Sequence, residues 1–133
     1  MANLIYDKLL SFGKLEPIAA GNFPDVLNLG RDSESNDYYP GKDFTSADRL
    51  TVDVCCLSPA GGTGATVTVQ GSADGSSGWS DIGKNSFTLK EMQAGPCKTA
   101  ISPNKYKYLR VNIAVTGVFT GSAQAFLNTY QGK

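Results

Sequence analysis

Hydrophobic and polar residues alternate one by one along three separate stretches of the chain. Apolar side chains occupy every second position from Leu50 to Cys56, at Val67 and Val69, and from Leu109 to Val115, with polar residues between most of them. A period of two is that of a β-strand with one buried face. We therefore expect strands over residues 49–57, 65–70 and 109–115, with the apolar positions facing a core.

Shorter apolar runs and the breaks between them extend this picture. Four further runs predict weaker strands: residues 26–29, 86–89, 97–101 and 123–130. Three clusters rich in Gly, Pro and Ser predict turns: residues 58–64, 71–78 and 93–96. Many short strands with such breaks predict an all-β fold, a single β-sandwich. Residues 4–12 are the only helix-like stretch, so we expect little helix.

The chain has the length of one domain, and its N-terminal part differs from the rest. Residues 1–48 carry four basic against eight acidic side chains, whereas residues 49–133 carry eight against four. Residues 31–47 are too polar and broken for a central strand, yet contain Tyr38, Tyr39 and Phe44. We expect an N-terminal arm and an ordered polar loop over residues 1–48, and the main sandwich strands over residues 49–133. The charge asymmetry fits either contacts with partners or a solvated N-terminal region.

Composition excludes the common catalytic arrangements. The chain has no histidine, so Ser-His-Asp and Cys-His sites are absent, and no phosphate-binding loop motif occurs. A carboxylate pair is the one catalytic alternative, with candidates Asp53, Asp74, Asp81 and Glu91 on an outer strand face or in loops. Cys55 and Cys56 are adjacent and point to opposite faces of a strand, so we expect no metal site and interpret Cys56 as a core residue. We predict no enzyme and no cofactor.

Charge and hydropathy also bear on partners and location. The formal net charge of +0 lacks the basic surplus of a nucleic-acid binder. No apolar stretch approaches the length of a membrane span, and the N-terminus lacks the features of a signal peptide. We therefore expect no nucleic-acid partner, no membrane association, and synthesis in the cytoplasm.

Trp79, the only tryptophan, opens a predicted return strand after a glycine-rich turn. Two roles are open for it. It would close one end of the core if the strand continues in register with Phe87 and Leu89, or it would be an exposed platform for a sugar, beside Gln70, Asp81 and Asn85. Gly83 makes the register uncertain.

The order of these motifs resembles that of the capsid cement, or decoration, proteins of tailed bacteriophages. The matching segments span nearly the whole chain: Leu9–Phe12, Ile18–Ala20, Asp25–Gly30, Leu50–Val54, Val67–Trp79, Tyr108–Ile113, and Gly117 and Gly121 before Ala125–Leu127. The resemblance implies a jelly-roll-like sandwich on the outside of a capsid. The stretch from Gln70 to Asp81 also resembles discoidin-like carbohydrate-binding domains, which keeps a glycan-binding module as an alternative. Another virion component, for tail or head completion, is a third.

The resemblance implies a structural virion protein that binds the major capsid protein, stabilises the shell and forms a dimer or trimer. The candidate contact residues are apolar or aromatic and belong to three regions: the N-terminal segment (Leu9, Leu10, Phe12), the polar loop (Tyr38, Tyr39, Phe44) and the outer face of the last strand (Phe126, Tyr130). Two aromatics on a face expected to meet water suggest a second buried contact, within the domain or with another chain. Ordinary packing inside the domain is the alternative for all eight.

Overall fold

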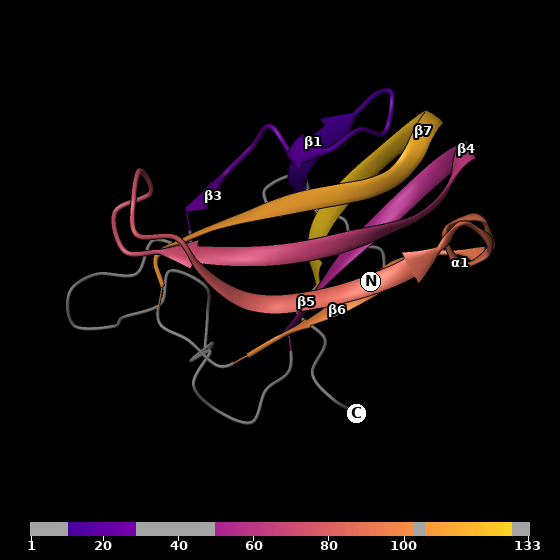
Figure 1. Cartoon of the computed structure of the whole chain (residues 1–133). Helices are drawn as coiled ribbons and strands as arrows, with labels where there is room; N and C mark the ends of the chain where they lie inside the picture. Colours follow the sequence, from indigo (N-terminus) through magenta and orange to yellow (C-terminus); the bar gives the residue numbers. More distant parts are fainter. Residues whose placement is uncertain (1–10, 29–49, 103–105, 129–133) are drawn as a thin grey trace.

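The computed structural model describes residues 11–28, 50–102 and 106–128, which form one antiparallel sheet of seven strands (Figure 1). The strands in chain order are β1 (Ser11–Leu15), β2 (Gly21–Asn22), β3 (Leu27–Asn28), β4 (Leu50–Ser72), β5 (Ser80–Thr88), β6 (Cys97–Ile101) and β7 (Tyr108–Asn128). The helix α1 (Leu89–Ala94) follows β5. Strands β1, β2 and β3 pair with β7, whereas β5 and β6 pair with β4. The prediction of an all-β sandwich is confirmed.

The sandwich is made by bending two long strands. β4 and β7 pair along their whole lengths, from Thr51 with Asn128 to Ser72 with Tyr108, and the register shifts between Leu57 and Gly64. On one side of this bend lie β1 and β6, and on the other β2, β3 and β5. The single sheet therefore folds over into two layers, as Figure 1 shows for β4 and β7.

The bend replaces a turn that the sequence predicted. Residues 58–64 were expected to separate two strands, but β4 runs through them. Gly61 and Gly117 have φ near +96° and +95°, a region that favours glycine, so the backbone changes direction without breaking the ladder. The predicted strands 49–57 and 65–70 are two halves of β4, and 109–115 and 123–130 fall largely within β7.

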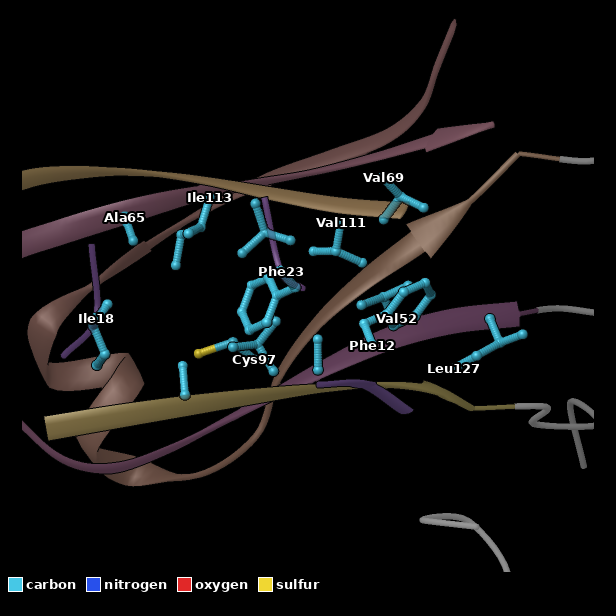
Figure 2. Packing of buried hydrophobic residues seen from close by; sticks show 14 of the residues in the cluster. Phe12, Ile18, Phe23, Val52, Ala65, Val69, Cys97, Val111, Ile113 and Leu127 are labelled. Atoms are coloured by element: carbon cyan, nitrogen blue, oxygen red, sulfur yellow. The ribbon is translucent and has the colours of Figure 1, made fainter. Parts of the chain in front are cut away.

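The core lies between the two layers and follows the predicted alternation (Figure 2). Val67 and Val69 of β4 and Val111 and Ile113 of β7 come from one layer, and Val52 of β4 faces them from the other. The remaining predicted inward residues that the structure buries are Val54, Leu109, Ala123, Ala125 and Leu127. Because this set matches the period-two pattern, the inward face predicted from sequence is confirmed.

Residues 11–28 belong to the sandwich. Phe12, Ile18, Phe23 and Leu27 are all buried in the core. The backbone N–H of Phe23 donates to the carbonyl of Val111 at 2.9 Å, which fixes this segment on β7. The arm expected over residues 1–48 thus contains a stretch that fills the core, and the helix-like stretch 4–12 ends in β1. Residues 1–10 and 29–49 lie outside the described part of the chain.

The helix α1 was not predicted, although the sequence carries its signal. The hydroxyl of Thr88 accepts from the backbone N–H of Glu91 at 3.2 Å, and the Glu91 carboxylate accepts from the Thr88 N–H at 2.9 Å. This reciprocal pair is a capping box, encoded by Thr-x-x-Glu. It ends β5 at Thr88, so the strand predicted over 86–89 is the end of β5 and the first helical residue. Gln93 of α1 donates to the carbonyl of Pro59 at 3.1 Å, which holds the helix beside the bend.

Candidate interaction surfaces

The outer face of the layer formed by β5 and the adjoining halves of β4 and β7 carries a ladder of polar side chains, which we call the polar face. In its central row Gln70 lies between Asp81 and Arg110. Gln70 Nε2 donates to Asp81 Oδ1 at 2.9 Å, and Arg110 Nε donates to Gln70 Oε1 at 2.8 Å. These bonds link three strands by side chains, in addition to the backbone ladder.

Trp79 lies on this polar face. The Arg110 guanidinium sits 4.2 Å from the centre of the Trp79 ring, a cation–π contact, and Arg110 alternates with the core residues Leu109 and Val111. The expected register with Phe87 is wrong because β5 contains a bulge: Val69 pairs with Gly83 and Gln70 with Asp81, which leaves Ile82 as the extra residue. One extra residue reverses the alternation, so Trp79 falls on the face opposite Phe87. It does not close the core.

The residues proposed to line a sugar groove separate in the structure. Gln70 and Asp81 lie beside Arg110 on the polar face. Asn85 is paired with the core residue Val67, and its amide donates to the carbonyl of Lys98 at 3.2 Å, so it points toward β6. Arg110 also covers one face of the Trp79 ring. A sugar would have to stack on the other ring face or displace the guanidinium.

The structure describes two of the eight candidate contact residues. Phe12 is fully buried in the core, which favours the packing alternative for its side chain. Phe126 is half-buried on β7, paired with Asp53 of β4. Leu9, Leu10, Tyr38, Tyr39, Phe44 and Tyr130 lie outside the described residues. Ser11, next to Phe12, pairs with Phe126, so the structure places the N-terminal segment beside the last strand, with the Phe12 side chain in the core.

Asp53 shares the outward face of β4 with Thr51, yet its side chain is 0% exposed. Lys98 of β6 lies directly opposite, and its Nζ is 2.8 Å from Asp53 Oδ2. Thr51 Oγ1 donates to Asp53 Oδ1 at 3.0 Å. Asp53 therefore lies on the outer face of its strand, as expected, and is buried there by the hydrogen bond from Thr51 and by the ion pair with Lys98, whose own side chain is 57% exposed.

Apolar side chains meet solvent at the bend of β4 and β7. Leu57 is 70% exposed and Val118 is 85% exposed. Val118 adjoins a shallow apolar pocket of about 200 Å³. The pocket is lined by Pro17, Ile18, Ala19, Ala20, Val115, Gly117, Val118 and Phe119. We call Val118 and this pocket the apolar edge. Leu57 lies apart from it, opposite Ser122, and borders another hollow with Cys55 and Gln124. Alternation does not indicate the apolar edge, because Val118 lies where the alternation is interrupted.

The three cysteines are free thiols. Cys56 is half-buried against the core and Cys97 is buried, which agrees with the interpretation of Cys56 as a core residue. Burial, with the neighbouring Cys55 as a smaller cause, raises the pKa of Cys56 to about 11. Burial raises the pKa of Cys97 to about 12, and Cys56 and Glu91 add to this. Both thiols are therefore poor nucleophiles at neutral pH.

Comparisons with known proteins leave the family open. No protein-family model matches the chain, and no curated protein matches it in sequence. Within the described ranges, no three Cys, Asp or Glu side chains converge as a metal site would require. The same ranges include no helix with the length and hydropathy needed to cross a bilayer.

Proposed function

We propose that this chain is a structural virion protein that decorates and stabilises the outside of a bacteriophage capsid by binding the major capsid protein. The order of sequence motifs supports the proposal, and the β-sandwich is a fold compatible with it. Binding across neighbouring subunits would stabilise a shell by mass action, in proportion to occupancy. Such a role requires surface complementarity and no catalytic group.

The apolar edge is the observation that carries the proposal. Val118 is 85% exposed beside a pocket whose walls are mostly apolar. Apolar side chains that protrude next to an apolar hollow are typical of surfaces that bind another protein. The edge lies where the two long paired strands bend, and α1 is hydrogen-bonded to Pro59 beside that bend.

Co-sedimentation with mature phage shells that lack the protein tests the proposal. We expect saturable binding at a fixed copy number per capsid subunit, and a shell that resists higher temperature when occupied. Val118→Ser should weaken binding, because it removes an apolar side chain from the edge. Thr120→Ser, two residues along the same strand and also exposed, is the matched control and should bind as the unmodified chain does. A folded protein that binds no matched shell would favour a tail or head-completion component.

A glycan-binding module is the second candidate, and the placement of Trp79 with Gln70 and Asp81 on one face supports it. Trp79 is the only tryptophan, so its fluorescence reports on this face alone. A saturable change in emission with neutral oligosaccharides would support the sugar site. An emission spectrum that does not change when oligosaccharides are added would contradict the sugar site.

A further inference from the structure

The guanidinium of Arg110 is held in one orientation by two contacts. Its Cζ atom lies 4.2 Å from the centre of the Trp79 ring, and its Nε donates to Gln70 Oε1 at 2.8 Å. Gln70 is fixed in turn by its bond to Asp81. The ring contact and the Nε hydrogen bond restrict the rotamers of the Arg110 side chain. The guanidinium therefore loses less conformational entropy when it binds a partner.

The two Nη groups of Arg110 remain available. Within the described residues, Nε makes the one hydrogen bond of this guanidinium. An arginine carries five N–H donors in a planar fork whose spacing matches the two oxygens of a carboxylate. Asp81, the acidic side chain in the same row, already accepts from Gln70. The Nη groups can therefore donate to an acceptor of another molecule in exchange for water.

The surroundings of Arg110 favour an anionic partner. Lys84 lies on the next row of the polar face, paired with Thr68. Tyr108 shares the outward side of β7 with Arg110, and Lys107 lies 5.5 Å from the centre of its ring. Asp81 is the acidic side chain in the row of Arg110. Asp74, in the loop before Trp79, is the other nearby carboxylate, and it already accepts hydrogen bonds from Ser72, Ser76 and Ser77. Arginine, tryptophan and tyrosine together are also the residues most enriched at the centres of protein–protein interfaces.

We propose that the polar face binds an acidic segment of a partner protein, with an Asp or Glu carboxylate of that segment seated on the Nη groups of Arg110. This surface is separate from the apolar edge: the loop before Trp79 and the helix α1 lie at opposite ends of β5 (Figure 1). The inference does not depend on shell binding. In a virion it would give the decorating protein a second contact, on a different face from the one used for the shell.

Trp79 fluorescence provides a direct test with a defined probe. A blocked oligo-glutamate peptide should produce a saturable change in emission, with an affinity that falls as salt is added. A blocked oligo-glutamine peptide of equal length should produce none. Binding of glucuronate in preference to the peptide would overturn the protein partner in favour of an acidic sugar. No saturable response to the peptide at millimolar concentration would overturn the proposal altogether.

Variants separate the fork of Arg110 from its charge. Arg110→Lys keeps the charge but loses the planar fork and the stacked contact, so we expect affinity to fall by about tenfold or more. Lys90→Gln removes one positive charge from α1, at the other end of β5, and should change affinity by less than about twofold. If Arg110→Lys binds as the unmodified chain does, or Lys90→Gln weakens binding as much as Arg110→Lys, attraction is non-specific and the proposal fails. Gln70→Ala, which frees the guanidinium without altering it, should weaken binding partially; an unchanged affinity there contradicts the positioning role.

Discussion

Strand β7 carries one buried and one exposed valine at which the same substitution can be compared. Val111 is 0% exposed and lies opposite Val69, which is equally buried. Val118, seven positions along β7, is 85% exposed. Replacing either by alanine removes the same two methyl groups and carries a similar loss of β-propensity. The difference between the two variants therefore isolates the contribution of burial.

The expected cost at Val111 follows from burial and cavity formation. Removing two buried methyl groups loses about 1.6 kcal/mol of transfer free energy, at ~0.8 kcal/mol for each carbon. The space left, roughly 50 Å³ if the surroundings do not relax, adds about 1.2 kcal/mol at ~24 cal/mol per Å³. We expect Val111→Ala to reduce the free energy of unfolding by about 3 kcal/mol, and Val118→Ala by less than about 1 kcal/mol.

Equilibrium unfolding in urea, followed by Trp79 fluorescence, measures both values. Similar urea dependence of the unfolding free energy in the two variants would show that their denatured states are comparable. In thermal unfolding, the same difference corresponds to a midpoint lower by about 10 °C for Val111→Ala. Equal losses in the two variants, or a loss under about 1 kcal/mol at Val111, would mean that this position does not face the core and would refute the described register of β7.

Four further perturbations test other features. Thr99→Val should raise the free energy of unfolding by about 1 kcal/mol, because the buried Thr99 hydroxyl has no hydrogen-bond partner among the described residues. Lys98→Met should lower it by about 1–2 kcal/mol in urea unfolding, because the buried Asp53 carboxylate loses a half-exposed cation but keeps its bond from Thr51. Gly62→Ala should lower the thermal midpoint, because the added Cβ would overlap the buried Phe119 ring at a cost of about 1–3 kcal/mol. Folding raises the pKa of the Cys97 thiol from 9.0 to about 12. The stabilising contribution of this shift is therefore complete below pH 9 and is lost as the pH rises toward 12. Cys97→Ala should make the fall in unfolding free energy above pH 9 less steep.

Three of these variants have a control substitution elsewhere in the chain. Thr66→Val is the control for Thr99→Val. It removes a hydroxyl that is already hydrogen-bonded to Ser86 on the polar face, so it should not raise the free energy of unfolding. Gly95→Ala places a Cβ where nothing lies within 4 Å, so its thermal midpoint should stay within a few degrees of the unmodified chain. Cys55→Ala, on the opposite face of β4 from the core, should leave the alkaline fall in stability largely in place. A Lys98→Met protein as stable as the unmodified chain would show that Asp53 is compensated by other contacts.

The inward face could be predicted from sequence because alternation depends on neighbours along the chain. Val67, Val69, Val111 and Ile113 were assigned correctly, and the bends do not change which face they occupy within each half-strand. The Gly-rich residues 58–64 have the composition of a turn, and only pairing with the distant β7 distinguishes a bend from a turn. The connection of four predicted strands into two therefore required tertiary information.

The polar face was harder to foresee than the core. The pairing of Arg110 with Trp79 depends on the bulge at Ile82, which reverses the alternation of β5. The neighbouring Gly83 signals an irregular register, but it does not say that one residue is added. The capping box at Thr88 and Glu91 is different, because its motif is local and visible in the sequence. Local motifs and alternation can thus be predicted from sequence. Contacts across three strands depend on strand register, which composition does not determine.

The continuous pairing of β4 with β7 has a consequence for how the chain folds. Thr51 meets Asn128 and Ser72 meets Tyr108, so the central ladder joins residues far apart in sequence, while β5 and β6 pair with β4 across shorter separations. Domains dominated by such non-local pairing fold slowly, in milliseconds to seconds. During synthesis β4 can acquire β5 and β6 early, but its other edge stays open until β7 emerges from the ribosome. That open edge is the point at which a nascent chain is most exposed to pairing with the wrong strand.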